Sequence, residues 1–389
     1  MLIFKDMREY SLNLPRQSRV LCLGAESAGN FTVYENGQAY FFSDFGDLLD
    51  DKNFNAYQEA LFGFFGKRNF VPDVITVDLH PDFKTSKLGM ELAQKFGCRL
   101  EKVQHHAAHI YSVLFDHIRA SQTQTLPRNF VGIAGDGTGY GLDGKIWGGE
   151  VFLYRQEAIG QPSPHGLRLT GSRPEVRIGH LENQLLCGGD LAIKEPARML
   201  LSILLGIKKP AELWPFFSAF YAEQQFNVLA KMREQKFNSV ETSSTGRVLD
   251  AASLLLGFCG NKRAYKHEPI DLLEKNSTEP FILKPQIEKQ DEYVLNTTWL
   301  FQWMLDNLDK DKGRLAATVQ KYIIEGLIEI AGKVNPDLPI YFGGGMANNK
   351  IMSQIAEENG VIMAKNIERG DNSLSLGQLM YCLWCDKLS

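Results

Sequence analysis

The sequence has no apolar run approaching the roughly 20 residues that a membrane-spanning helix needs. Its first residues place charges where a signal peptide needs an apolar core, so we expect a cytoplasmic protein. An excess of positive charge is also missing, because the formal net charge is −4. Such a chain has no general field that attracts a nucleic-acid backbone. We therefore expect neither a membrane nor a nucleic acid among its partners.

Cysteine is scarce and scattered. Six cysteines in 389 residues are typical of reduced thiols rather than of a disulfide framework. Only Cys382 and Cys385 have the spacing of a metal or redox pair, and no second CxxC completes a zinc site. We expect these two side chains to pack one turn apart on a helix.

The length of the chain exceeds what one hydrophobic core usually organises, and a hydrophobic content of 44% is enough to fill two. Strand-like runs such as VITVDL alternate with amphipathic runs such as SKLGMELAQKFG, a pattern typical of α/β proteins. From Gly179 onward, apolar residues recur mostly at the three- and four-residue spacing of helices. We expect an N-terminal lobe over residues 1–178 and a C-terminal lobe with a helical insertion over 179–389.

A histidine pair is the strongest local signal. His105 and His109 stand four residues apart in VQHHAAHI, so on a helix they project from one face and can bind one metal ion. A third ligand, which we expect to be a carboxylate, would have to come from elsewhere in the chain. The motif alone is more often two surface or core histidines. The neighbouring His106 points away from that face, so we expect it to pack rather than to ligate.

A glycine-rich segment, VGIAGDGTGYGLDGKIWGGEVFLY, lies between two expected strands. A glycine-rich turn exposes backbone N–H groups that can approach phosphate oxygens closely. Asp136, at the strand end, is a candidate to orient a metal-bound water or to contact a phosphate. An ordinary glycine hairpin explains the same pattern equally well.

Two further segments place polar residues at helix starts. In IYFGGGMANNKIM a buried strand leads through glycines to a helix N-terminus, where Asn349 is placed to bind a ribose or a base. This segment lacks the GxGxxG order of a dinucleotide site. In ERGDNSLSLGQLM, Asp371 follows Gly370 at the start of a helical run, and helix capping is the simplest interpretation of that residue alone.

Read in order, a series of motifs resembles the C-terminal transferase region of the HypF family, carbamoyltransferases of [NiFe]-hydrogenase maturation. The motifs are GAES, DLHPDF, VQHHAAH, GDGTGYGLDGKIWGGE, GHLENQLLCGGDLAIKEPARM, TGRVLDAASLLLG, GGGMANN and GDNSLSLGQ. The region also resembles antibiotic O-carbamoyltransferases and, more distantly, the tRNA-modifying TsaD proteins. The resemblance implies the two-lobed α/β fold of actin, the sugar kinases and the heat-shock ATPases, a duplicated RNase H-like fold with helical insertions here.

The resemblance also implies the site. It assigns one divalent ion, iron or zinc, to His105, His109 and Asp371. It assigns the ribose of an adenine nucleotide to Asp250, and the whole set of nucleotide-binding residues is Gly137, Thr138, Gly139, Asp250, Gly344, Gly345 and Asn349. Lys194 and Arg198, with Asp190, lie where they could reach the donor or the acceptor, and they join Asp136 as catalytic candidates. As helix residues they could equally form a structural ion pair.

For function, the resemblance implies transfer of a carbamoyl group from carbamoyl adenylate to the C-terminal cysteine of a HypE-like acceptor protein, with the metal as a Lewis acid. The acylphosphatase, zinc-finger and YrdC-like modules of full-length HypF do not fit in this chain, so we expect a separate YrdC-like protein or domain to make the donor from ATP. An O-carbamoyltransferase of a small metabolite and a weakened nucleotide-binding scaffold remain alternatives.

The sequence departs from the family pattern at two places. Lys266 and His267 follow Tyr265 where glutamate and glycine are usual, and Asn372 and Ser373 stand where two glycines are common. A side chain in place of glycine blocks the close approach of a ligand. These departures bear on nucleotide affinity more than on the fold.

Overall fold

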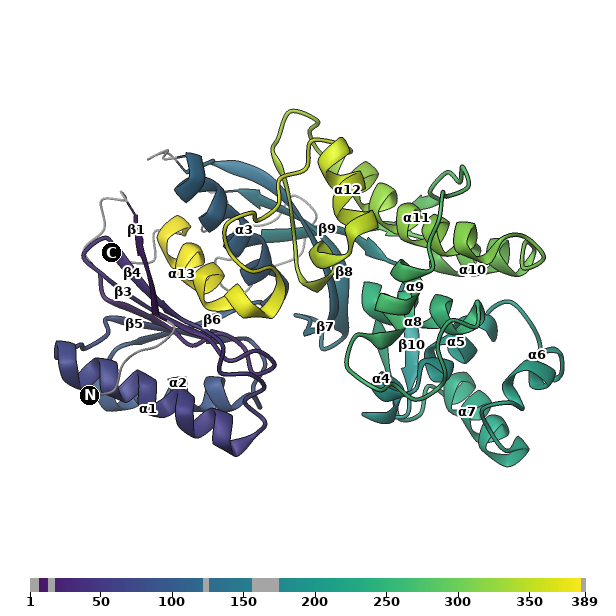
Figure 1. The fold of residues 1–389 in the computed structure, drawn as a ribbon, viewed down its shortest axis with the longest axis horizontal. Helices are drawn as coiled ribbons and strands as arrows, with labels where there is room; N and C mark the ends of the chain where they lie inside the picture. The colour runs from purple at the N-terminus through teal and green to yellow at the C-terminus, as the bar shows by residue number, and fades with distance from the viewer. Residues whose placement is uncertain (1–6, 13–17, 122–125, 156–174, 386–389) are drawn as a thin grey trace.

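The computed structural model describes residues 7–12, 18–121, 126–155 and 175–385 of the chain. These residues form two β-sheets with helices on their faces, and one pair of helices lies between the sheets (Figure 1). The two-lobed α/β architecture that the sequence predicts is confirmed. The division of the chain between residues 178 and 179 stays a prediction. Within the described ranges, no helix has the length and apolar character needed to cross a membrane.

The first sheet is mixed. Its strand order is β1-β4-β3-β2-β5-β6, antiparallel from β1 to β2 and parallel from β2 to β6. The hairpin between β3 and β4 turns at Asn36 and Gly37, whose φ angles of 52° and 81° are the two positive values that a tight hairpin turn requires. The strands are β1 (Met7–Ser11), β2 (Val20–Cys22), β3 (Phe31–Glu35), β4 (Gln38–Phe42), β5 (Val74–Asp78) and β6 (Arg99–Val103).

Two helices, α1 (Asp51–Arg68) and α2 (Lys84–Phe96), cover one face of this sheet. Their apolar side chains share a core with the strands, in which Phe31 stacks on Phe42 with ring centroids 4.3 Å apart. As the sequence predicts, α2 ends at Gly97, which has the left-handed φ of 64° that favours glycine.

The second sheet has eight strands in the part of the chain that the structure describes. Its main path is β10-β11-β8-β9-β13-β12, and β7 pairs with both β8 and β14. The strands are β7 (Asn129–Tyr140), β8 (Ile146–Arg155), β9 (Glu175–Leu181), β10 (Gln184–Cys187), β11 (Ser239–Thr242), β12 (Ile287–Lys289), β13 (Tyr293–Leu295) and β14 (Ile340–Gly343). Because β14 and β7 run parallel, the residues that follow Gly343 and those that follow Ala134 emerge at the same edge.

Helices also cover the second sheet, and α8 and α11 pack against its strands. The run of helices expected after Gly179 is present. The helices of this layer and its extension are α4 (Leu191–Lys194), α5 (Pro196–Leu204), α6 (Pro210–Phe217), α7 (Glu223–Gln235), α8 (Thr245–Leu255), α9 (Glu268–Lys275), α10 (Thr297–Leu305), α11 (Lys312–Gly332) and α12 (Lys350–Glu358).

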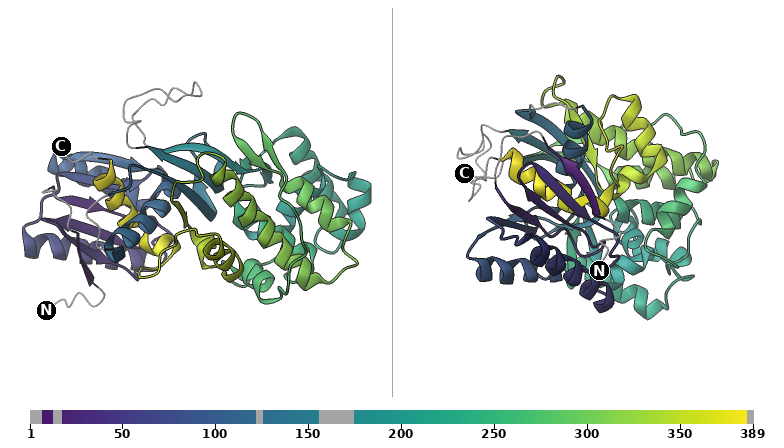
Figure 2. Two further views of the ribbon diagram at one scale, coloured as in Figure 1. Left: turned by 90° about the horizontal axis from the view of Figure 1, so that it is seen from above. Right: turned by 60° about the vertical axis from the view of Figure 1, so that its left-hand side comes forward.

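The two central helices join the lobes. Helix α3 (His105–Ser121) packs against β7 and β14 of the second sheet, and α13 (Leu374–Trp384) packs against β2 and β3 of the first. The two helices also pack on each other (Figure 2). Cys382 and Cys385 are buried at the end of α13, which confirms their expected packing role. A segment from near the C-terminus thus completes the N-terminal lobe.

Candidate metal and nucleotide site

The histidine pair opens helix α3. His105 and His109 lie one turn apart, and their Nε2 atoms are 3.1 Å from each other. His105 is 5% exposed and His109 is fully buried, because α3 is enclosed between the sheets. Two buried imidazoles that present their Nε2 atoms to one point form half of a metal-binding group.

Two carboxylates complete this group. Asp136 lies in β7, and Asp371 lies in the short 3-10 turn η3 (Gly370–Ser373) that precedes α13. Asp371 Oδ1 is 3.3 Å from both histidine Nε2 atoms, and Asp136 Oδ2 is 3.3 and 3.5 Å from those of His105 and His109. One ligand atom from each of the four residues lies within 4.8 Å of the others. The structure therefore brings the three predicted metal ligands together and adds Asp136 to them.

A second layer of polar groups orients these four. Asp78, at the end of β5, lies 2.7 Å from Nδ1 of His105. Ser27 donates a hydrogen bond to Oδ2 of Asp371, and Asn30 donates from its amide to the backbone oxygen of Asp371 at 2.8 Å. The loop between β2 and β3 thus fixes the carboxylate that arrives from the far end of the sequence.

Close packing of α3 and α13 sets the spacing of the group. At Gly377 a Cβ atom would overlap the backbone oxygen of Ala108 and lie 3.0 Å from the nitrogen of Ser112. Only glycine lets the two backbones come this close. The glycine in the run DNSLSLGQ therefore holds Asp371, six positions earlier, against the histidines of α3.

The charges of the group favour a cation at its centre. Burial opposes charge on the imidazoles, but Asp78, Asp136 and Asp371 outweigh it and raise the pKa of His105 well above its ordinary value. Burial also opposes ionisation of Asp371, yet the neighbouring His105 and His109 side chains hold its pKa well below the usual range. Once a metal has displaced the imidazole protons, two carboxylates beside two neutral imidazoles carry a net negative charge, which a divalent ion would neutralise.

One unsatisfied atom supports the same conclusion. Asp371 Oδ1 is buried and, among the described residues, has no hydrogen-bond partner of suitable geometry, although both Nε2 atoms lie 3.3 Å away. Buried carboxylate oxygens are rarely left without a partner. The donor set, two imidazole nitrogens and two carboxylate oxygens, suits iron or zinc.

His106 takes no part in the group. It is fully buried, its Nδ1 lies 2.9 Å from the Gln104 amide, and burial together with the neighbouring His105 lowers its pKa to about 3. This neutral, packed histidine matches the role expected for it from the sequence.

The glycine-rich segment forms an antiparallel hairpin of β7 and β8. Gly137, Thr138 and Gly139 lie within strand β7, which continues to Tyr140 with a register shift against β8, and the reversal follows at Gly141 to Lys145. The hairpin interpretation is confirmed, with its turn just after these residues, and their nucleotide-binding role stays a prediction. The pairing with β8 extends the strand through the glycines, and a bulge rather than a turn releases it next to Asp136.

The second glycine segment meets β7 beside the same aspartate. Gly344 has a φ of 97°, and a Cβ there would overlap the backbone oxygen of Gly135. The backbone nitrogen of Gly345 lies 3.3 Å from Asp136 Oδ1. These predicted nucleotide residues therefore lie next to the metal-binding group.

The side-chain amide of Asn349 is hydrogen-bonded within the protein. Its Oδ1 accepts from the backbone nitrogen of Met352 at 2.9 Å and caps α12, and its Nδ2 donates to Gln320 at 2.7 Å. Both ends of the side chain have partners in the structure.

Asp250 is buried in α8 between two guanidinium groups. It pairs with Arg247 at 2.9 Å, and it accepts a hydrogen bond from Arg263. Arg247 also donates to the backbone oxygen of Ile193, and its Nη2 is 3.8 Å from where a Cβ on Gly137 would lie. Arg247 therefore lies between Asp250 and the glycines beside Asp136.

The catalytic candidates from the CGGD segment have different surroundings. Arg198 pairs with Glu195 at 2.7 Å, which matches the structural ion pair that the sequence left open. Lys194 and Asp190 are exposed at α4, and α4 contacts the site through the bond from Arg247 to Ile193.

The two departures from the family pattern occupy different surroundings. Lys266 and His267 are exposed, and His267 precedes α9. Burial and the charge of Lys266 lower the pKa of His267, while the charges of Asp136 and Arg247 also act on it. Asn372 and Ser373 continue the η3 turn after Asp371.

Sequence reasoning missed several residues here. Asp136 was given a catalytic role rather than a place in the four-residue group, and Asp78, Ser27 and Arg263 were given none. Asp78 and Ser27 stand within the quoted motifs DLHPDF and GAES, so the motifs contained a signal. Arg263 lies in no motif.

Comparison with known proteins places the site in context. Residues 132–378 match the family described as carbamoyltransferase, Kae1-like domain, second subdomain, and residues 15–116 match the HypF Kae1-like domain. The chain is 34% identical, over 386 residues, to the probable carbamoyltransferase HypF of Methanocaldococcus jannaschii, covering 94% of this chain and 46% of that protein.

Two solved structures share the fold. The crystal structure of T. kodakarensis HypF has a TM-score of 0.82 and 27% identity, with 99% of this chain and 49% of that chain covered. A full-length HypF in a phosphate- and nucleotide-bound form has a TM-score of 0.82 and 22% identity, with 97% and 57% covered. The expected fold class is confirmed. The chain spans about half the length of these relatives.

Proposed function

Because this chain belongs to the HypF carbamoyltransferase family, we propose that it transfers a carbamoyl group from carbamoyl adenylate to the C-terminal cysteine thiol of a HypE-like acceptor protein. In this step the cysteine thiol loses its proton to solvent, its sulfur forms a bond to the carbamoyl carbon, and the bond from that carbon to the adenylate phosphate oxygen breaks. The products are a thiocarboxamide on the acceptor and AMP. The grouping of His105, His109, Asp136 and Asp371 carries the proposal.

We propose that these four residues hold one divalent ion, iron or zinc. When bound, such an ion supplies Lewis-acid stabilisation of negative charge on a carbonyl or phosphate oxygen. The chain itself positions the ligands: Asp78 orients His105, and Ser27 orients Asp371.

The nucleotide is proposed to lie along the glycines beside this group. Gly137 to Gly139 in β7 and Gly344 to Gly345 after β14 offer backbone close to Asp136, and the atom nearest to a Cβ position at Gly137 is Nη2 of Arg247, at 3.8 Å. A full-length HypF has been solved in a phosphate- and nucleotide-bound form, which supports a nucleotide as the ligand. Asp250 is the proposed ribose acceptor, and Asn349 the proposed contact on the adenosine side.

Lys194 and Arg198 are the proposed cationic residues on the acceptor side. Lys194 is exposed on α4 and is free to approach an incoming chain, whereas Arg198 is held by Glu195 and acts by fixing α5. The donor is proposed to come from a separate YrdC-like adenylating protein or domain.

The test is a single-turnover transfer assay. Purified chain, carbamoyl adenylate generated by a YrdC-like enzyme, and a HypE-like acceptor are mixed, and the acceptor is weighed by mass spectrometry. We expect a gain of one carbamoyl group, and none on an acceptor whose terminal cysteine is replaced by alanine. An unmodified acceptor in the presence of intact donor would refute the proposal.

A further inference from the structure

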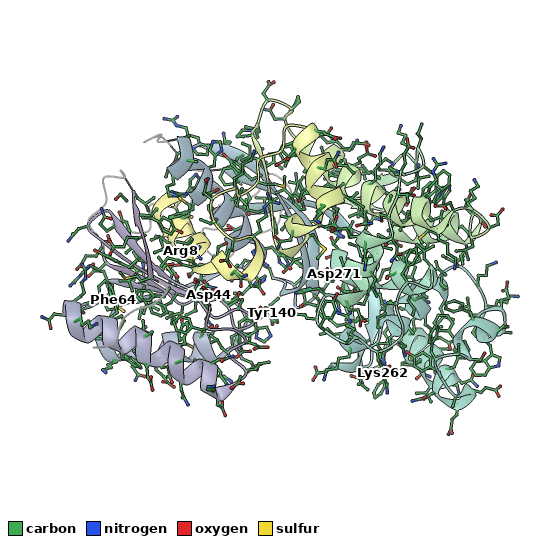
Figure 3. All side chains as sticks on the ribbon, viewed as in Figure 1. Arg8, Asp44, Phe64, Tyr140, Lys262 and Asp271 are labelled. Atoms are coloured by element: carbon green, nitrogen blue, oxygen red, sulfur yellow. The ribbon has the colours of Figure 1, made fainter. Side chains whose placement is uncertain are left out.

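A surface segment connects α8 to α9 and carries one arginine inward. Within residues 257–267, the side chains of Lys262 and of 264–267 are exposed, and Lys262 is labelled in Figure 3. The side chain of Arg263 is only 9% exposed. A residue so different from its neighbours has a specific partner beneath the segment.

That partner is Asp250. The Nη2 atom of Arg263 donates to Asp250 Oδ2, the same oxygen that Arg247 approaches at 2.9 Å. Nη1 of Arg263 donates to the backbone oxygen of Lys266 at 2.9 Å, so the guanidinium also ties its own segment down. Arg263 therefore connects the segment to the centre of α8.

The contact encloses the carboxylate completely. Asp250 is 1% exposed, and its second oxygen, Oδ1, is inaccessible to solvent and has no hydrogen-bond partner among the described residues. A ribose hydroxyl needs an accessible acceptor oxygen. With Arg263 in place, neither oxygen of Asp250 can be reached from solution.

We propose that Arg263 occupies the ribose subsite and thereby sets the affinity for the nucleotide, so that binding requires its guanidinium to leave Asp250. This inference rests on the proposed function in one respect, the assignment of Asp250 as the ribose acceptor. Arg263 is thus an intramolecular competitor of the ligand, not a residue that binds it.

The surroundings allow such a displacement. Asp250 retains Arg247, so its charge stays paired when Arg263 leaves. The segment begins at Gly257, with a φ of 78°, and Gly260 has no neighbour near its Cβ position. Its other contacts lie to either side of Arg263: Asn261 accepts from the backbone of Ala197, and the Ala264 nitrogen donates to Glu268 at 2.5 Å. The long, flexible Arg263 side chain can swing out between these two fixed points.

The direction in which a substitution changes the affinity for adenosine and for AMP distinguishes this inference from simple attraction of the phosphate by Arg263. Arg263→Ala removes a competitor, so it should tighten the binding of neutral adenosine as well as of AMP. If the arginine merely attracted phosphate, its loss would weaken AMP and leave adenosine unchanged. Lys262→Ala is the matched control, because it removes one positive charge from the preceding position and leaves the contacts of Asp250 intact.

The experiment is calorimetric titration of the full chain with adenosine and with AMP. We expect Arg263→Ala to lower both dissociation constants by roughly 10-fold, as when the binding-competent state rises from about one tenth to nearly full population, while Lys262→Ala leaves adenosine binding as in the wild type. Unchanged or weaker adenosine binding by Arg263→Ala, or adenosine binding by neither protein, would overturn the inference.

Two further variants keep the test decisive. If Arg263→Ala does not fold, Arg263→Gln, which keeps a side-chain N–H donor but loses the charge, should give a smaller gain of the same sign. Adding Asp250→Asn to Arg263→Ala should cancel the gain, and a gain that persists would show that another group was exposed. Because these titrations contain no donor and no acceptor, a failure of carbamoyl transfer leaves their outcome readable.

Discussion

His105 presents its Nδ1 atom to Asp78 at 2.7 Å, although Asp78 is not one of the four residues around the candidate metal centre. A carboxylate that accepts a hydrogen bond from the N–H of one ring nitrogen leaves the other nitrogen free to bind a metal. Asp78 therefore determines which tautomer His105 adopts.

Replacing Asp78 by Asn should weaken metal binding by about 10- to 100-fold, the usual effect of losing such an orienting partner. All four proposed ligands remain in this variant, so the loss measures what the Asp78 carboxylate contributes through orientation and charge. Competition with a chromogenic chelator gives the affinity. An affinity equal to that of the wild type would show that His105 needs no orienting carboxylate.

Replacing His109 by Ala should remove the metal. This side chain is buried and supplies one of the two imidazoles, so elemental analysis should show little bound metal while the circular dichroism spectrum is nearly unchanged. The control is His117→Ala, a histidine of the same helix that contacts Tyr341 instead. Full metal content in His109→Ala would contradict the proposed ligand set.

Gly377→Ala should destabilise the protein by about 1 to 3 kcal/mol, because its Cβ would meet the backbone of α3, which cannot move aside as a side chain can. The matched control is Gly332→Ala, at the end of α11, where a Cβ would meet nothing within 4 Å. Urea denaturation of both variants gives the free energies. Equal stability of the two would mean that α3 and α13 can separate without cost.

Metal affinity should fall as the pH is lowered. Burial opposes the charge, but Asp136 and Asp371 raise the pKa of His109, and with Asp78 they raise that of His105. Below these pKa values the metal must displace protons from the imidazoles, so each displaced proton weakens binding by about tenfold per pH unit. Metal titrations at several pH values test this, and an affinity independent of pH down to about 6, below the ordinary histidine pKa, would contradict it.

The sequence predicted the histidine pair directly, because two residues four positions apart on a helix lie on the same face. Asp371 could not be found in that way. It is separated from His109 by most of the second lobe, and only the resemblance of its motif identified it. The same resemblance left Asp136 outside the ligand group, because its place depends on how β7 runs past the start of α3.

Other structural details could not be predicted from any sequence pattern. Glycines promote both turns and bulged strands, so the run from Gly135 to Gly139 did not reveal that β8 pairs along it. Arg263 lies in an irregular segment, where no periodicity indicates which side chain turns inward. Asp250 was recognised from its motif, but its enclosure by two arginines is a property of the folded structure.

The contact between α13 and the first sheet bears on how the protein is made. The Gly24 nitrogen donates to Gln378 Oε1 at 2.9 Å across 354 positions of sequence. While a ribosome is still adding the intervening residues, the face of the first sheet that α13 covers has no partner, and its apolar side chains are open to chaperones or to aggregation. Asp371 emerges almost together with α13, so a nascent chain that already carries both histidines still lacks a closed metal centre. Metal loading should therefore follow translation of α13 rather than accompany it.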